Sequence, residues 1–367
     1  MSTERSTERS AERAAIGAVE TGPVQSGAVE TAAAEADALP PLFDRRLVIV
    51  TGKGGTGKTT VAAALAVAAA RSGLSVLVAD VGSTEQIAQR IVPGHAPVGY
   101  AGCELLPGLT AIHIDPFEAL AEYLGLQLRA RSLVDLAIGN KGFHQLLEAS
   151  PGWRELITLG KVWHLAQQRD ATGSAQFPLI VVDAPATGHG LTFLDVPRVV
   201  ASAVRSGPLR AHAQLVEDLI HDPEQCLLLP VALAEELPAR ETAELVARAR
   251  DQLGVAVDRV AVNAVAPAPF PDHVPENLDR LLARIPPDAD LGSLPPAAAL
   301  AACAAHLRSR YELNRRYLTE IARSSSLPVV SLPYVAGGPE GAEALYHFAA
   351  ALDPKRPSAT RTADALR

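Results

Sequence analysis

The sequence predicts an α/β fold in which helices cover both faces of a doubly wound, mostly parallel sheet. Short runs rich in Leu, Ile and Val alternate with longer helical patterns, as successive strand–helix–strand units require. The run 179–182 is apolar at every position, which is typical of a central strand that is buried on both faces. A glycine-rich segment, 52–60, lies between one such run and an Ala-rich helical pattern.

The elements follow in order along the chain. The expected strands are 46–51, 76–81, 109–114, 178–183, 226–232, 257–264 and 327–332. Two long helices are expected at 237–253 and 298–323, and the region 116–170 is interpreted as a helical insertion between strands.

Composition divides the chain into one domain with two tails. Residues 1–43 repeat Ser-Thr-Glu-Arg and contain few large apolar side chains, so we expect a disordered N-terminal extension. Residues 44–352 form the predicted domain, with a helical subdomain drawn from 116–170 and 197–225, and 353–367 form a flexible C-terminal tail.

Charge and cysteine usage exclude several classes of partner. The net charge of −8 gives no general attraction to nucleic acid or to anionic lipid. Three scattered cysteines suit a reducing compartment, so we expect a cytoplasmic protein. No window approaches the roughly 18 consecutive apolar residues of a membrane span, so no stable membrane insertion is expected.

The glycine-rich segment has the spacing of a phosphate-binding loop, G-x-x-x-x-G-K-T, in the required strand–loop–helix context. Its backbone N–H groups and the helix N-terminus would face phosphate oxygens. Lys58 would bridge the β- and γ-phosphates, Thr59 would ligate Mg²⁺, and Thr60 would contact the α-phosphate. The predicted nucleotide-binding residues of this loop are Gly52, Lys53, Gly54, Gly55, Thr56, Gly57, Lys58, Thr59 and Thr60. The sequence therefore predicts a P-loop fold that binds ATP and Mg²⁺.

Two aspartates each end a predicted strand. Asp183 ends an apolar strand in the way that a Walker B element does, and it would hold Mg²⁺ or its waters. Asp80 would lie at the same edge of the sheet, where it could orient the attacking water or merely cap the following helix. We favour the catalytic role for Asp80.

The base is expected to be adenine, because no guanine-reading Asn-Lys-x-Asp or Thr-Lys-x-Asp element follows the later strands. Asn263, at the end of a predicted strand, could hydrogen-bond the edge of the base or simply begin a turn.

The early lysine of the loop, Lys53, resembles the extra lysine of the deviant Walker A motif. Members with this motif form dimers that sandwich ATP, and the resemblance implies that Lys53 reaches the nucleotide of a partner subunit. Lys53, Lys58 and Asp80 are thus the predicted catalytic residues.

The chain as a whole resembles the arsenite-pump (ArsA) ATPase family, which includes the guided-entry ATPases that target tail-anchored proteins. The resemblance covers most of residues 46–350. By this likeness Asn263 and Pro333 occupy adenine-binding positions, and Asp183 senses Mg²⁺. The motifs that carry it are 52–60, Ile114-Asp115-Pro116, Asp183-Ala184-Pro185-Ala186-Thr187-Gly188-His189, Glu235-Glu236-Leu237-Pro238, Glu241-Thr242 and Asn263.

Departures from the family pattern narrow the resemblance. Switch I of the family reads Asp-Pro-Ala-His, whereas this chain has only its aspartate, followed by Val81-Gly82-Ser83. The Met-rich insert of the targeting members is absent, and their Cys-x-x-Cys zinc motif is replaced by Cys303-Ala304-Ala305-His306, which could be plain helix packing or a zinc pair. The chain is most similar to single-domain bacterial ArsA-like ATPases, some of which occur as paired paralogues.

These features predict an ATP hydrolase whose dimer, either a homodimer or a heterodimer with a paralogue, opens and closes around an unidentified apolar or protein client. The client surface would come from 116–170 and 197–225. The alternative is a weakly hydrolysing regulatory or scaffold subunit that is paired with a paralogous ATPase. A positioning ATPase that binds membrane or DNA fits less well, because residues 353–367 contain no amphipathic helix and the net charge is acidic.

Overall fold

The computed structural model describes residues 42–82, 84–128, 145, 152–269, 284, 286 and 295–352. The predicted N-terminal extension lies outside the described residues except for Leu42 and Phe43, and the predicted C-terminal tail, 353–367, lies wholly outside them. The described chain opens with a short 3-10 helix, Leu42–Asp44, in which Leu42 is buried. Leu42, two residues before the expected boundary at residue 44, therefore already packs into the core.

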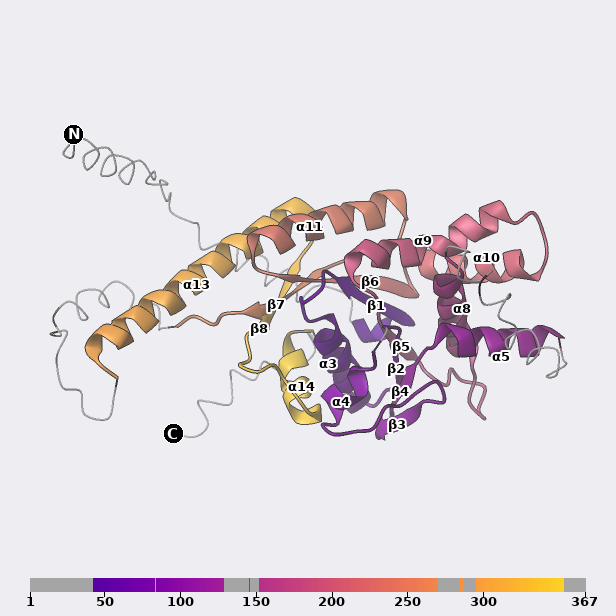
Figure 1. The fold of residues 1–367 in the computed structure, drawn as a ribbon, viewed down its shortest axis with the longest axis horizontal. Coiled ribbons are helices and arrows are strands. Elements are labelled where there is room, and N and C mark those ends of the chain that lie inside the picture. The colour runs from indigo at the N-terminus through magenta and orange to yellow at the C-terminus, as the bar shows by residue number, and fades with distance from the viewer. Residues whose placement is uncertain are drawn as a thin grey trace.

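A single sheet runs through the centre of the molecule, in the order β3-β4-β2-β5-β1-β6-β7-β8 (Figure 1). Every neighbouring pair is parallel except β3 and β4. This topology confirms the predicted doubly wound, mostly parallel sheet. The strands are β1 Leu47–Gly52, β2 Val76–Asp80, β3 Cys103–Leu106, β4 Leu109–His113, β5 Leu179–Asp183, β6 Cys226–Leu233, β7 Val260–Val265 and β8 Val329–Pro333.

The antiparallel edge strand β3 was not predicted from the sequence. It has only four residues, it is partly exposed, and its pairing with β4 is interrupted by a register shift. A short edge strand carries no continuous apolar run, and such a run was the signal by which the central strands were recognised.

Helices cover both faces of the sheet, as alternation along the strands requires. In β1, Leu47 and Ile49 pack into one apolar cluster, and Val48 and Val50 into the other. Helices α3, α4 and α14 cover the second face, and the remaining long helices lie on the first (Figure 1). The helices are α3 Lys58–Arg71, α4 Ile87–Ile91, α5 Pro116–Leu128, α8 Trp153–Gln167, α9 Thr187–Ala203, α10 Pro208–His221, α11 Glu236–Ala247, α13 Ala297–Ser325 and α14 Ala342–Phe348.

Two helical regions extend from the sheet in opposite directions (Figure 1). Helices α5, α8, α9 and α10 gather at one end. Helices α5, α8 and α10 come from the segments 116–170 and 197–225 of the predicted helical subdomain, whereas α9 begins ten residues before the second segment. At the other end α13 packs beside α11 with its last turns, where Tyr317 and Ile321 are buried, and its first turns project away from the sheet. Among the described helices, none combines the length and the apolar character that crossing a membrane would need.

Candidate functional site

The phosphate-binding loop connects β1 to α3, and its own side chains hold its curl. The carbonyl oxygen of Lys53 accepts hydrogen bonds from Thr56 Oγ1 at 2.9 Å and from Lys58 Nζ at 3.1 Å. Gly57 caps α3 with φ of 90°, a left-handed conformation that favours glycine. The loop therefore presents the N-terminus of a 14-residue helix at the carboxyl edge of the sheet.

The loop is packed closely against the later strands on its far side. A Cβ at Gly52 would lie 2.2 Å from the carbonyl oxygen of Val231 in β6, and a Cβ at Gly57 would lie 2.1 Å from Asn263 Nδ2 in β7. At Gly52 the close atom is backbone, so this position requires glycine for space as well as for its φ of 150°. At Gly57 the close atom is the end of a side chain, so the requirement for glycine comes from its φ of 90°. Two of the predicted loop glycines thus have a structural reason. Gly54 and Gly55 instead lie open, since a Cβ at either position would meet no neighbouring atom of the described chain within 4 Å.

The two residues predicted to bind Mg²⁺, Thr59 and Asp183, are in direct contact. Thr59 Oγ1, in the first turn of α3, donates a hydrogen bond to Asp183 Oδ2 at 2.6 Å. The second carboxylate oxygen of Asp183, Oδ1, is buried and has no hydrogen-bond partner among the described residues. A hydroxyl and a carboxylate oxygen are the ligands that Mg²⁺ prefers, so this pair fits the ion that the sequence predicts.

Burial dominates the charge state of Asp183. Desolvation raises its pKa to about 6, while the Thr59 hydrogen bond and the nearby Lys58 ammonium act in the opposite direction and Asp80 adds to the rise. The pKa of Lys58 is lowered, chiefly by burial, although Asp183 opposes that change. A divalent cation beside Asp183 would favour its ionised form, because the opposite charge would offset the desolvation cost.

Asp80 lies next to Asp183, since the two residues are register partners on the adjacent strands β2 and β5. Its carboxylate is buried and accepts backbone N–H groups on both oxygens, from Gly82 at 3.0 Å and from Gln86 at 2.9 Å. In the structure Asp80 therefore organises the loop that follows β2. Asp80 is also separated from β1 by one strand, β5, and it lies beside the carboxylate that meets the first turn of α3.

Asn263 contacts the phosphate loop. Its Nδ2 donates to the carbonyl oxygen of Thr56 at 2.9 Å, and its Oδ1 accepts from the backbone of Ala264 at 2.7 Å. Pro333 ends the neighbouring strand β8 and is exposed, opposite Val265 in register. Asn263 and Pro333 thus lie on adjacent strands at the same edge, and Asn263 has an additional bracing contact that the sequence did not predict.

Lys53 forms an ion pair with Glu241 of α11. Its Nζ lies 2.5 Å from Glu241 Oε1, and both side chains are partly exposed. In the sequence, Glu241 was noted only as part of a family motif. Lys53 and Glu241 are 188 residues apart, and no sequence pattern indicates that two residues so distant are in contact. The place of Glu241 beside the predicted loop was therefore missed.

The remaining predicted residue of the loop, Thr60, is buried in the first turn of α3.

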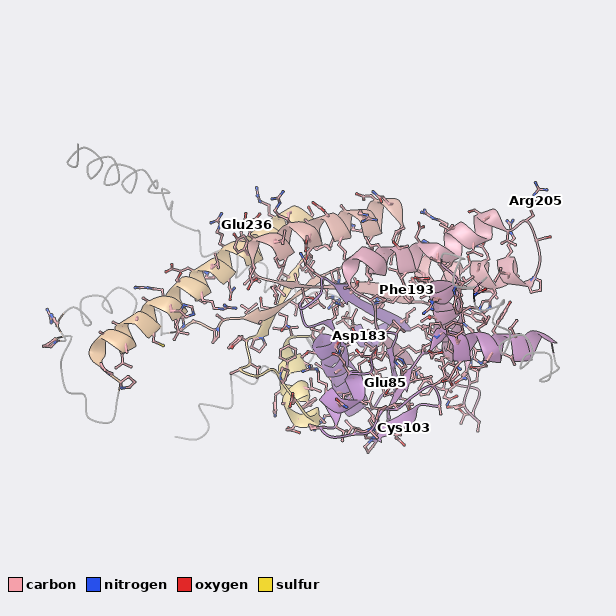
Figure 2. The ribbon with its side chains drawn as sticks, in the orientation of Figure 1. Glu85, Cys103, Asp183, Phe193, Arg205 and Glu236 are labelled. Atoms are coloured by element: carbon pink, nitrogen blue, oxygen red, sulfur yellow. The ribbon has the colours of Figure 1, made fainter. Side chains whose placement is uncertain are left out.

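In Figure 2, Asp183 lies near the centre of the molecule, whereas Arg205, in the connection between α9 and α10, lies at the outer end of the helical region. The outer end of the predicted client region is therefore far from the predicted nucleotide site, although α5 begins near the sheet edge, where Ile114 N donates to the carbonyl oxygen of Asp80.

A cavity lies in that helical region. Tyr123 of α5, Trp163 of α8 and His212 of α10 bring their rings together, with centroid distances to the imidazole of 5.2 and 5.3 Å. Together with Glu122 and Lys161 these rings line a cavity of about 150 Å³. No motif pointed to this cluster, since it is assembled from three separate helices.

The ion pair at the edge of this cavity is tightly bonded. Lys161 Nζ lies 2.6 Å from Glu122 Oε2, and the hydroxyl of Tyr100 also donates to Glu122. Burial, followed by the contact with Glu122, raises the pKa of Tyr100, so this hydroxyl stays protonated. The cluster thus joins α5 and α8 through both rings and charges.

The alternative zinc pair receives no support from clustering. Cys303 and His306 lie on the exposed first turns of α13. Within the described part of the chain, no three His, Cys, Asp or Glu side chains group in a way that could hold a metal ion.

Comparison with known proteins agrees with this geometry. A family described as anion-transporting ATPase matches residues 45–207, which contain the phosphate loop and Asp183. The ATPase BagA of Mycobacterium tuberculosis is 33% identical over 235 residues, or 61% of this chain and 66% of that protein. The arsenical pump-driving ATPase of Escherichia coli is 30% identical over 247 residues, or 59% of this chain but only 39% of that protein.

The chain therefore spans about two thirds of the mycobacterial relative and about two fifths of the bacterial pump protein. The segment matched by the family includes the loop between β1 and α3. A P-loop in a doubly wound sheet, a bonded Thr59–Asp183 pair and these matches lead to one assignment: the chain belongs to the ArsA family of ATPases.

Proposed function

We propose that this chain binds and hydrolyses Mg-ATP, and that hydrolysis drives the opening and closing of a dimer around an apolar or protein client. The observation that carries the proposal is the convergence of Lys58, Thr59, Asp183 and Asp80 at one edge of the sheet. These residue types, so arranged, match the needs of phosphoryl transfer, in which catalysis depends on positioning and on charge stabilisation.

Each residue has a distinct task in this proposal. Lys58 leaves its contact with the Lys53 carbonyl and places its ammonium on the β- and γ-phosphates. Thr59 and Asp183 hold Mg²⁺, which, when bound, neutralises charge that develops on the phosphate oxygens. Asp80 accepts a hydrogen bond from the attacking water and so orients it in line with the γ-phosphoryl group. Asn263 and Pro333 contact the adenine.

The proposed pairing of two subunits follows from Lys53, the early lysine of the loop. Lys53 would reach the nucleotide of a partner, so that two chains, either identical or paralogous, close over ATP. The apolar residues exposed on the helical region support a client surface there: Leu126 is 61% exposed, Val199 53% and Leu215 44%. We place the activity in the cell interior, as the free cysteines support.

One observation favours the second candidate, a weakly hydrolysing regulatory subunit. Both carboxylate oxygens of Asp80 already accept a hydrogen bond from a backbone N–H group, so the residue can hold water only through the acceptor sites that remain on those oxygens. If it cannot, the paralogue would perform the chemistry and this chain would contribute only binding.

Turnover measured against protein concentration tests the proposal. We expect the specific activity of the purified chain to rise with its concentration, because each site is completed by Lys53 of a second subunit, and we expect Lys53→Ala to lose that rise. Activity that appears only after the paralogue is added would favour the regulatory candidate. Concentration-independent activity from a chain that sedimentation shows to be monomeric would refute the sandwich dimer.

A further inference from the structure

The lysine that would reach a partner is bonded to its own subunit. Lys53 Nζ donates a charge-assisted hydrogen bond to Glu241 Oε1, and the two groups form an ion pair. The side chains of Lys53 and Glu241 are 40% and 33% exposed, so water competes with the pair without separating it. In this position the Lys53 ammonium is held against α11 of its own subunit.

Both ends of this ion pair are carried on elements that the fold holds together. The carbonyl oxygen of Val231 approaches Gly52 so closely that no side chain fits there, which locks β6 against the start of the loop. Strand β6 leads directly into α11, which carries Glu241 in its second turn. The backbone of Lys53 is held in turn by the hydrogen bonds that its carbonyl accepts. The contact is therefore a consequence of the packed sheet edge.

The environment of Glu241 also favours its contact with Lys53. Its second carboxylate oxygen, Oε2, is buried and lacks a hydrogen-bond partner within the described residues. A partly buried carboxylate with one unsatisfied oxygen depends strongly on the cation at its other oxygen, because its charge is otherwise poorly solvated. Loss of Lys53 from Glu241 thus carries a cost for the subunit that loses it.

We propose that Glu241 is a positioning residue that restrains Lys53 on its own subunit and thereby sets the protein concentration at which ATP drives pairing. The inference rests on the proposed function, since it concerns the lysine of the sandwich dimer. Pairing exchanges one anionic partner of Lys53, the Glu241 carboxylate, for another, the phosphates of the partner's nucleotide. A triphosphate competes for the ammonium better than a diphosphate does, so the exchange favours pairing with ATP over pairing with ADP.

Glu241→Gln tests this inference, because it keeps the shape of the side chain and removes the charge that holds Lys53. Sedimentation velocity with Mg-ATP should show half-maximal pairing at a concentration about two- to five-fold lower than for the unaltered chain, the range that partly exposed ion pairs are worth. Glu244→Gln is the matched control, since it removes the same charge from an exposed position on the same helix. It should leave the pairing concentration unchanged.

A double-mutant cycle separates restraint of Lys53 from a general effect on α11. If Glu241 acts through Lys53, then the residual pairing of Lys53→Ala, measured by sedimentation at high protein concentration, should be unchanged when Glu241→Gln is added. An unchanged pairing concentration in Glu241→Gln, or weaker pairing, would overturn the inference while leaving the sandwich dimer standing. ATP affinity, measured separately by calorimetry, should be the same in both glutamine variants. A chain that binds ATP but never pairs would instead overturn the dimer of the proposed function, and the restraint with it.

Discussion

The carboxyl edge of the sheet and the helical region are built in different ways. At the sheet edge, short polar side chains from β2, β5, β7 and the phosphate loop bond to one another or to backbone groups, and the contacts of Asp183 and Asn263 cross between elements. In the helical region, the rings of Tyr123, Trp163 and His212 pack around a hollow, and one ion pair links α5 to α8.

Under the proposed function, this difference would separate ATP chemistry from client recognition. Hydrogen-bonded residues at strand ends are positioned to within tenths of an ångström, as phosphoryl transfer requires. A cavity lined by rings can repack at a smaller cost in free energy, because contacts between rings depend less on direction than the hydrogen bonds of the sheet edge do. We therefore expect substitutions at the sheet edge to change ATP chemistry and those in the helical region to change stability or client binding.

A pair of lysine variants tests this separation with the largest expected effect. Lys58→Ala removes the charge that faces the β- and γ-phosphates, so we expect ATP binding or turnover to fall by at least about 10²- to 10³-fold. The fold should persist, because the Lys58 ammonium is bonded to the Lys53 carbonyl within the same loop and joins no distant elements of the described chain by a hydrogen bond. Lys161→Ala is the control from the helical region and should leave basal ATP turnover intact. Calorimetry and steady-state turnover measure both variants. Full activity in Lys58→Ala would contradict the P-loop assignment.

Asp80 gives the second test, within the sheet edge itself. Asp80→Asn keeps the shape but loses the charge that would accept a hydrogen bond from water, so hydrolysis should fall by roughly 10²- to 10⁴-fold while ATP affinity changes little. Glu85→Gln is the matched control, because Glu85 likewise accepts two backbone N–H groups, from Val98 and Gly99. Single-turnover hydrolysis measures the effect. Unchanged hydrolysis in Asp80→Asn would reduce the residue to a cap of its loop and favour the regulatory candidate.

The sequence was sufficient where a site is local in the chain. The strand, the glycine-rich loop and the first turn of α3 are continuous, so their spacing alone predicted the arrangement in which Lys58 and Thr59 lie. Asp183 was predicted because an apolar strand ends at it, and the structure places it on Thr59. The doubly wound sheet followed from the same apolar runs.

The sequence was insufficient where contacts join distant segments. Glu241 meets Lys53 across 188 residues, and Asn263 meets Thr56 across 207, with no periodicity to relate them. The edge strand β3 lacks a continuous apolar run, and the ring cluster around His212 requires three helices to be placed first. Tertiary packing creates these features, and local patterns do not encode them.

Asn263 gives a third test, which divides its bracing role from its proposed contact with adenine. Asn263→Ala removes the hydrogen bond to the Thr56 carbonyl, so affinity for tripolyphosphate, which has no base, should fall about three-fold. Affinity for ATP should fall further, by up to about ten-fold, because the adenine contact is lost as well. Calorimetry with both ligands supplies the comparison. Equal losses would remove the adenine role, and an unchanged affinity for tripolyphosphate would remove the brace.

The smallest expected effect concerns His212, in the helical region, and it should appear in stability rather than in ATP chemistry. Burial, aided by the charge of His164, lowers the pKa of His212 below its ordinary value of 6.5. The folded chain therefore disfavours the imidazolium, whereas the unfolded chain accepts the proton freely. Below pH 6.5 the unfolded state binds more protons at this site, so stability is present above that pH and is lost as the pH falls through it.

His212→Phe keeps a ring against Tyr123 and Trp163 and removes the titrating group, so the free energy of unfolding should depend less on pH than in the unaltered chain. Urea unfolding at about pH 7.5 and about pH 5.5 measures that dependence, across the range in which histidine titrates. His306→Phe, at an exposed position on α13, is the control and should retain the original pH dependence. ATP affinity at the higher pH should be unchanged by either substitution, because His212 belongs to the helical region and the phosphates bind at the sheet edge. An equal pH dependence in His212→Phe and the unaltered chain would show that the imidazole is not destabilised in the cluster, and a loss of ATP affinity would break the separation between the two regions.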